Sequence, residues 1–198
     1  VTIKYNNSGV QQWVARYNRT GISKGGPDAI AVDAAGNVYL TGYADGVGAD
    51  YVTIKYNTSG VQQWAVFYNG PGNGFDEADF IAIDYAGNVY VTGESQGNGT
   101  GGDYCTIKYN SSGFEQWVAR YNGPVNYQSD GANFVAVDNL GNVYITGHSA
   151  QSMSGTGPRD ICTIKYNSSG TMQWVAWHNG PGNDDDDGMA IALDGNGN

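Results

Sequence analysis

The residues best suited to chemistry are the carboxylates of three acidic stretches, at 76–79, at 130 and at 184–187. Asn183, just before the last stretch, alternates along the chain with Asp185 and Asp187, and Gly188 follows them, which is the spacing of oxygen ligands in a calcium-binding loop. The other stretches lack this spacing and no helices are expected to flank it, so a solvated acidic loop is the alternative. We therefore expect no cofactor, with calcium at Asn183, Asp185 and Asp187 as the only candidate.

No grouping typical of catalysis accompanies these carboxylates. The sequence has two histidines, His148 and His178, and neither belongs to a Ser-His-Asp arrangement. Carboxylate pairs of the kind that hydrolyse glycosides could be assembled, but with 19 acidic residues such a match carries little information. We predict that the protein is not an enzyme.

These residues are held by a repeated unit. The sequence Thr-Ile-Lys-Tyr-Asn begins at residues 2, 53, 106 and 163, at steps of 51, 53 and 57 residues. A tryptophan follows each copy at a fixed distance: Trp13, Trp64, Trp117 and Trp174. We expect one repeat region over 1–198, with repeats at about 1–51, 52–104 and 105–161 and an incomplete one at 162–198.

Composition excludes several classes of partner. The net charge is −10, and four of the nine basic residues are the repeated lysines at 4, 55, 108 and 165, so no basic patch remains for nucleic acid. No apolar run approaches the ~18 residues of a membrane span. The 31 glycines, with many Asn, Tyr, Thr and Val, favour short strands joined by tight turns.

Each unit contains four expected strands, which in one copy lie at 80–84, 88–93, 104–109 and 116–121. The first two are joined by Asp-x-x-Gly-Asn and the last two by Asn-x-Ser-Gly, both typical of hairpin turns. These two turns keep their length in every copy. The loop between the second and third strands does not, because its span grows from 11 to 13 to 16 residues.

Successive turns of an antiparallel meander lie on opposite edges of the sheet. The two constant turns therefore share one face, and the loops that vary in length or composition share the other, which we call the variable face. Binding residues commonly lie on variable loops held by a constant scaffold. We predict a binding face formed by Asp45, Asp76, Glu77, Asp79, Glu94, Asp130, His148, Arg159, Asp184 and Asp186.

The expected sheets need cover on both of their faces. The first strand is a continuous apolar run, which predicts burial on both sides, and the fourth strand alternates around the repeated tryptophan. Stacking such sheets around an axis covers them, so we predict an all-β protein, a β-propeller of four-stranded antiparallel blades.

The repeated lysines are interpreted as packing residues whose ammonium groups reach a repeated aspartate such as Asp50, Asp103 or Asp160. Cys105 and Cys162 are expected to be free thiols.

Four segments carry a resemblance to a known family: 70–76, 81–84, 87–93 and 103–110. They resemble the bacterial β-propeller repeats called SBBP, and similar segments recur along essentially the whole chain. The resemblance implies an exported, extracellular or cell-surface module of a longer bacterial polypeptide, without catalytic residues.

The sequence departs from a closed ring. It opens on a third strand and stops just before a fourth copy of the second strand, which gives fifteen expected strands. We therefore expect three full blades plus partial blades, an arc of a larger propeller, unless another segment supplies the missing strand. Exposed sheet edges would then favour self-association.

Three functions remain open at this stage. The favoured one is a non-catalytic module that binds a protein or a glycan through the variable face. The alternatives are a structural subunit that assembles through open blade edges and a glycan hydrolase or lyase.

Overall fold

The computed structural model describes residues 1–17, 25–46, 48–150, 158–182, 184–194 and 197, and their regular structure consists only of β-strands. The strands form one two-stranded sheet and three four-stranded antiparallel sheets. Their bounds are β1 (Thr2–Tyr5), β2 (Gln11–Ala15), β3 (Gly25–Val32), β4 (Val38–Gly46), β5 (Gly48–Tyr56), β6 (Gln62–Tyr68), β7 (Asp76–Ile83), β8 (Val89–Gln96), β9 (Gly102–Tyr109), β10 (Glu115–Tyr121), β11 (Gly131–Val137), β12 (Val143–Ala150), β13 (Arg159–Tyr166) and β14 (Met172–His178).

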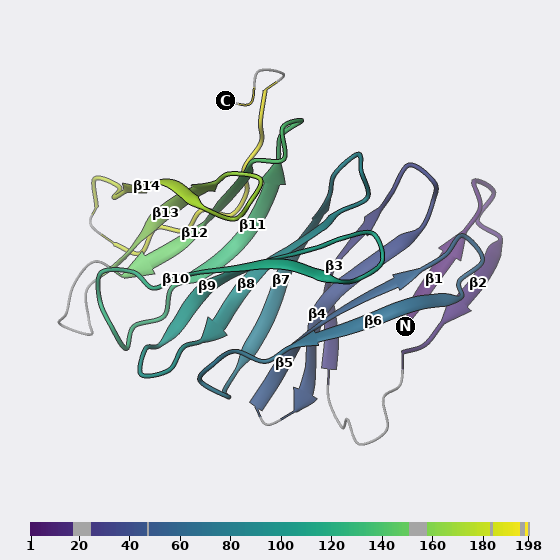
Figure 1. Cartoon of the computed structure of the whole chain (residues 1–198), viewed down its shortest axis with the longest axis horizontal. Coiled ribbons are helices and arrows are strands. Elements are labelled where there is room, and N and C mark those ends of the chain that lie inside the picture. The colour runs from purple at the N-terminus through teal and green to yellow at the C-terminus, as the bar shows by residue number, and fades with distance from the viewer. Residues whose placement is uncertain (18–24, 47, 151–157, 183, 195–196, 198) are drawn as a thin grey trace.

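The sheets are successive blades of an open arc. We call β1–β2 the N-terminal hairpin, β3–β6 blade 1, β7–β10 blade 2 and β11–β14 blade 3. Within each blade the order in the sheet follows the order in the chain, which confirms the predicted meander. Figure 1 shows the hairpin and the three blades side by side in a fan that does not close into a ring. The predicted propeller-like blades and open arc are therefore confirmed.

One expected strand is missing. Residues 189–194 correspond to the first strand of a further blade, but they form no strand, so the expectation of fifteen strands is wrong. A strand needs a hydrogen-bonded neighbour, and no second strand lies beside this segment among the described residues.

The turns form as their sequences predict. In the turn of blade 1 the Asn57 side-chain oxygen accepts hydrogen bonds from the backbone N–H groups of Ser59 at 3.0 Å and Val61 at 2.9 Å, and Gly60 takes a φ of +78°. In blade 2, Asp84 accepts from the backbone N–H of Asn88 at 2.9 Å and from the Tyr90 hydroxyl at 3.0 Å. These bonds fix each turn to its own sheet.

Blades pack on one another through the repeated tryptophans and tyrosines. Trp64 of blade 1 lies on Tyr39 of its own blade, with ring centroids 5.9 Å apart, and its Nε1 donates to the Ser111 carbonyl of blade 2 at 3.2 Å. The buried cluster at this junction also contains Ile81, Val91 and Ile107 of blade 2. Burial of such large side chains supplies much of the free energy that holds the blades together.

The repeated lysines serve the same junctions. Lys55 Nζ lies 5.0 Å from the centroid of the Tyr39 ring and donates to the Ser111 carbonyl of the next blade at 3.1 Å. Lys108 repeats this arrangement over Tyr90. The predicted packing role is confirmed, but the predicted aspartate partner is wrong, because the ammonium is satisfied by an aromatic face and a carbonyl.

Burial of the first strands depends on the blade. Ile81 of blade 2 is 3% exposed, as the apolar run predicts, whereas its equivalent in blade 1, Ile30, is 59% exposed and Val32 is 60% exposed. The first strands of neighbouring blades contact one another, and the N-terminal hairpin contributes no first strand to cover β3. The prediction of burial on both sides therefore fails for blade 1.

Both cysteines lie in the interior of the protein. Cys105 and Cys162 are free, buried thiols, as predicted, and burial raises the pKa of each to about 12, which keeps them protonated and unreactive.

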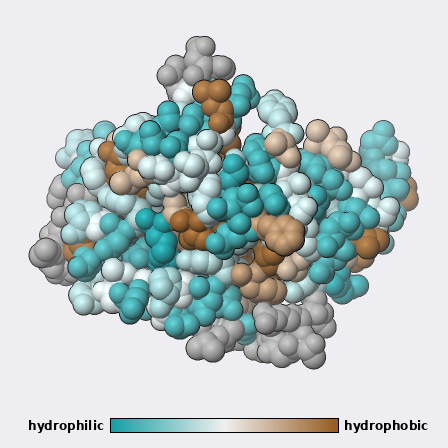
Figure 2. All heavy atoms as spheres, in the orientation of Figure 1, coloured by the Kyte–Doolittle hydropathy of each residue, from teal (hydrophilic) through white to brown (hydrophobic). Residues whose placement is uncertain are grey.

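Figure 2 shows a mainly hydrophilic surface with hydrophobic residues in separate patches. Among the described residues there is no helix long and apolar enough to cross a membrane.

Candidate functional site

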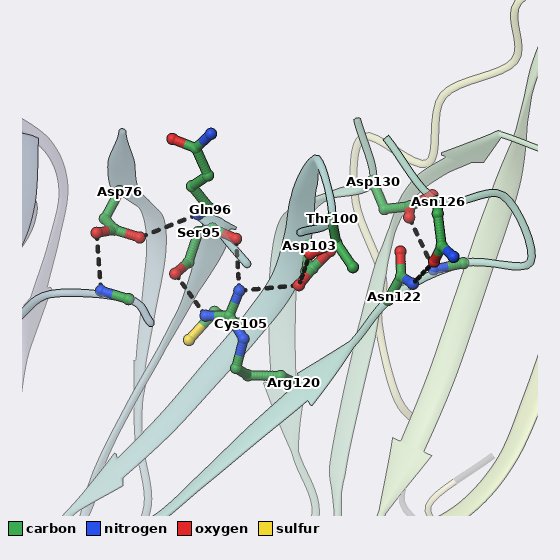
Figure 3. Close-up of polar contacts among 12 residues, drawn as sticks. Asp76, Ser95, Gln96, Thr100, Asp103, Cys105, Arg120, Asn122, Asn126 and Asp130 are labelled. Atoms are coloured by element: carbon green, nitrogen blue, oxygen red, sulfur yellow. Dashed lines mark hydrogen bonds and ion pairs between the residues drawn. The ribbon is translucent and has the colours of Figure 1, made fainter. Parts of the chain in front are cut away.

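The variable face carries carboxylates of two kinds, and the first kind supports its loops. Asp76, at the start of β7, accepts hydrogen bonds from the backbone N–H of Gly70 at 2.8 Å and of Gln96 at 3.1 Å. Asp130 repeats this with Gly123 at 2.7 Å and Ala150 at 3.1 Å. Figure 3 shows both side chains turned toward these loops.

These aspartates are not available to a ligand. Asp76 and Asp130 are both 0% exposed. Asp186 takes the equivalent place after blade 3, where it accepts from the Gly180 backbone N–H at 2.6 Å. The prediction that Asp76 and Asp130 contribute to a binding surface is therefore corrected, because their carboxylates accept hydrogen bonds from backbone N–H groups of the loop that enters each blade. Asp186 accepts the same kind of bond but stays partly exposed. We call all three the loop-capping aspartates.

The second kind forms a group that we call the inner acidic cluster: Asp28, Glu77, Asp79 and Glu94. Glu77 lies directly opposite Glu94 in the β7–β8 ladder, and β3, which carries Asp28, packs against β7. Burial raises the pKa of Asp79 to about 7, and the negative charges of Glu77, Asp28 and Glu94 contribute to the increase. Burial also raises the pKa of Glu77, where Asp28 and Glu94 add to the effect.

A repeated β-bulge positions part of this cluster. The ladder register shifts between Ala78 and Phe80, so Asp79 is the extra residue of the bulge. Asp28 occupies the bulge of β3 and Asn133 that of β11. At each bulge the backbone of the blade's first strand lies in close contact with a glycine of the second strand. In blade 2 a Cβ at Gly93 would lie 2.0 Å from the Glu77 carbonyl oxygen. Bulges redirect side chains, and here they direct polar ones to the same level of successive blades.

On the blade 3 side the acidic residues of the following loop have hydrogen-bonding partners. His148 Nδ1 lies 2.8 Å from an Asp187 carboxylate oxygen, and the Asn133 side-chain amide donates to that same oxygen at 3.0 Å. Arg159 bonds to Asp185 through its backbone N–H at 2.9 Å and its guanidinium at 3.3 Å. His148 and Arg159, both predicted as binding residues, therefore pair with the acidic loop beside them.

The predicted calcium loop lies only partly within the described residues. Asn183 is outside them, and Asp185 and Asp187 bond to Arg159 and to His148, as above. Among the residues that the structure describes, no three His, Cys, Asp or Glu side chains are grouped closely enough to hold a metal ion. Of the other predicted residues, Asp184 is exposed and Asp45 is partly buried in β4.

Sequence analysis missed Arg120. Its guanidinium donates to the Asp103 carboxylate at 2.9 Å, to the Ser95 carbonyl at 2.6 Å and to the Tyr68 hydroxyl of blade 1 at 3.2 Å (Figure 3). Asp103 has a side chain only 6% exposed. Arg120 thus binds two strands of blade 2 to blade 1 beneath the variable face. The signal in the sequence is an arginine, present also as Arg16 in the first copy, at a position where Phe67 and Trp177 stand in the other two copies.

The opposite face has a concavity of about 580 Å³. It is lined by the constant turns of the three blades, including the exposed Tyr85, over a floor that contains Ile83 and Val137. Its carboxylates, Asp33, Asp84 and Asp138, already accept hydrogen bonds within their own turns. Residues present in every blade at the same place are best explained by the fold of the blade.

Comparison with known proteins agrees with this architecture. A sequence search found no match among curated proteins. Residues 81–99 match the beta-propeller repeat family SBBP. They span the end of β7, the turn that follows it, all of β8 and the start of the next loop. The resemblance expected from the sequence is thereby confirmed at residues 81–99, which match an SBBP beta-propeller repeat.

Proposed function

We propose that the chain is a non-catalytic propeller module, exposed at a bacterial cell surface or secreted, that binds a partner through the inner acidic cluster. The observation that carries this proposal is the elevated pKa of Asp79, about 7, in a group of four carboxylates drawn from two blades. Burial of a carboxylate beside other negative charges is costly to the fold, and strongly perturbed carboxylates concentrate at functional sites.

The chemistry of the cluster favours a positively charged partner. None of its four carboxylates accepts a hydrogen bond from, or forms an ion pair with, another described residue, whereas Asp185 pairs with Arg159 and Asp187 lies within hydrogen-bond distance of His148. A lysine or arginine from outside would relieve the repulsion and would be steered by the net charge of −10. A basic protein segment therefore fits better than a neutral glycan, which remains the second partner class.

The test compares matched substitutions on the two faces. A fluorescent peptide rich in lysine and arginine is titrated with the whole chain, and a glycan array is screened in parallel. Glu77→Gln should weaken peptide binding about fivefold or more, because it removes one charge from the cluster. Glu115→Gln removes one charge on the face of constant turns and should leave binding unchanged. Equal effects of the two substitutions, or binding of neither probe, would contradict the proposal.

The enzyme alternative has its own readout. A glycan-active enzyme would convert members of the same array into products, and Asp79→Asn would abolish the conversion. The SBBP repeat is a structural repeat family, which favours binding over catalysis. We therefore retain binding as the function that the geometry supports best.

A further inference from the structure

The junction between blades 1 and 2 contains a cation that the chain itself supplies. The Arg120 guanidinium donates to Ser95 Oγ at 2.5 Å, to the Ser95 carbonyl at 2.6 Å and to the Asp103 carboxylate at 2.9 Å. It also donates to the Tyr68 hydroxyl of blade 1 at 3.2 Å. A serine, an aspartate and a tyrosine from two blades therefore form a binding site for one guanidinium group.

The junction between blades 2 and 3 repeats these three residues. Ser149 lies directly opposite Asp160 in the β12–β13 ladder, in the same register that places Ser95 opposite Asp103 in blade 2. Side chains of directly opposite residues lie on the same face of a sheet. Tyr121 ends β10 of the adjacent blade, as the tyrosine of the first site ends β6. The residues that surround the guanidinium are thus repeated one blade further along the chain.

The loops that enter the two blades also pack in the same way. A Cβ added at Gly123, which follows blade 2, would lie 2.4 Å from Ser149 Oγ, and one added at Gly70, which follows blade 1, would lie 2.3 Å from Ser95 Oγ. Each serine therefore faces the preceding blade. Because Asp160 shares a sheet face with Ser149, both residues lie on the side of blade 3 that packs on blade 2.

The two junctions differ at the position of the arginine. Arg120 lies opposite Cys105 in the β9–β10 ladder, and Trp177 takes this place opposite Cys162 in blade 3. An indole is uncharged and has a single N–H donor, whereas a guanidinium is positively charged and has five. Blade 3 therefore has the acceptors of the site but not the arginine that donates to them in blade 2.

Two buried oxygen atoms at this place lack the donors that an arginine would supply. No described residue donates a hydrogen bond to Asp160 Oδ1 or to Ser149 Oγ, although Asp160 is 6% exposed and Ser149 is 0% exposed. Burial raises the pKa of Asp160, and the charge of Asp186 adds to the increase, while His178 opposes it. A buried acceptor without a donor costs free energy, and a cationic donor would recover it.

We propose that the junction between blades 2 and 3 binds a small guanidinium compound from outside the chain, held by Asp160 and Ser149 in the way that blade 2 holds Arg120. The ligand has to be small because Ser149 is wholly buried. Its planar fork of N–H groups matches a carboxylate beside a hydroxyl. The site shares no residue with the inner acidic cluster, so the proposal does not depend on the function proposed above.

The test is thermal unfolding of the whole chain in guanidinium chloride at up to about 20 mM, where the denaturing action of this salt is small. Relative to sodium chloride at the same ionic strength, the unfolding midpoint of the wild-type chain should rise by about 2 °C or more, because the ligand binds only the folded state. Asp160→Asn and Ser149→Ala should lose this rise. Glu77→Gln, in the inner acidic cluster, should keep it, which separates this site from the proposed binding face.

Arg120→Ala opens the first site to the same probe and serves as an internal reference. This variant should unfold at a lower temperature than the wild-type chain. Guanidinium chloride should recover part of the loss, because Ser95 and Asp103 regain a donor. Such a rescue shows that the probe reaches a buried blade junction. Rescue of Arg120→Ala without any rise in the wild-type chain would overturn the proposal.

Substitution of Trp177 supplies the cation from within the chain. Trp177→Leu removes the indole without adding a charge and should keep the response to guanidinium chloride. Trp177→Arg should unfold at a higher temperature than Trp177→Leu and should lose the response, since its own guanidinium occupies the site. Equal shifts of the wild-type midpoint by the two salts, a response that persists in Asp160→Asn, or one that Trp177→Arg leaves unchanged would contradict the proposal.

Discussion

Two groups of carboxylates on one face behave in opposite ways. The loop-capping aspartates Asp76 and Asp130 are buried and bonded to backbone N–H groups, so their charges are needed by the fold. The inner acidic cluster lies at the bulges of the first strands, where its members mainly face one another. Asp76 and Glu77 are neighbours in sequence, yet they belong to different groups. The acidic character of a loop therefore says little about its role until its partners are known.

The difference has a physical basis in hydrogen bonding. A carboxylate that accepts two backbone N–H groups replaces the water it loses, so burial costs little. A carboxylate that is buried beside other carboxylates gains nothing in exchange, and its pKa rises instead. Stability should thus fall when the first kind is removed and rise when the second kind is neutralised. Two substitutions, at Asp76 and Asp79, test this contrast, and a third, at Arg120, tests a buried carboxylate that is paired with a cation.

The largest effect is expected at Arg120, which pairs with the buried Asp103. Arg120→Met keeps much of the side-chain volume but leaves the Asp103 carboxylate buried without its cation, which should lower the free energy of unfolding by about 3 kcal/mol. Urea denaturation measures the change. Arg159→Met is the control, because Arg159 and its partner Asp185 are largely exposed and this pair should contribute below about 1 kcal/mol. Similar losses in both variants would contradict the assignment.

Removal of a loop-capping aspartate should have the next largest effect. Asp76→Ala leaves the backbone N–H groups of Gly70 and Gln96 without their acceptor, so the free energy of unfolding should fall by about 2 kcal/mol. The exposed Asp184 lies on the same face, and Asp184→Ala should change it by less than about 0.5 kcal/mol. If the two substitutions proved equivalent, Asp76 would not be a cap.

Neutralising Asp79 should produce the smallest effect, with the opposite sign. Its pKa is about 7 in the folded chain against 3.8 for the ordinary value, so the folded state holds the extra proton and loses stability as pH rises through this window. Asp79→Asn should therefore stabilise the chain by about 1 kcal/mol near pH 8 and hardly at all near pH 4. Thermal unfolding at the two pH values measures the difference. A gain independent of pH would refute it.

The repeat alone was sufficient to predict the blades. Thr-Ile-Lys-Tyr-Asn, the two constant turns and the spaced tryptophans specify strands and hairpins through local geometry, and the structure has them in the expected order. The glycine of the second strand was readable as a repeat but not explained, since its reason is the bulge that presses on Gly93. Arg120 was missed because its partners come from three different strands.

What the sequence determined, then, is the twisted four-stranded unit and its need for neighbours, because alternation, turn residues and repeated aromatics act over a few positions. Only the tertiary structure decided which carboxylates meet backbone donors and which meet each other. It also decided that Trp13, Trp64 and Trp117 each pack on a turn glycine of the next sheet. The partners of the carboxylates and the contacts of the tryptophans depend on which strands lie side by side across a bulge or a blade junction. The spacing of residues in the sequence does not give the distance between such strands.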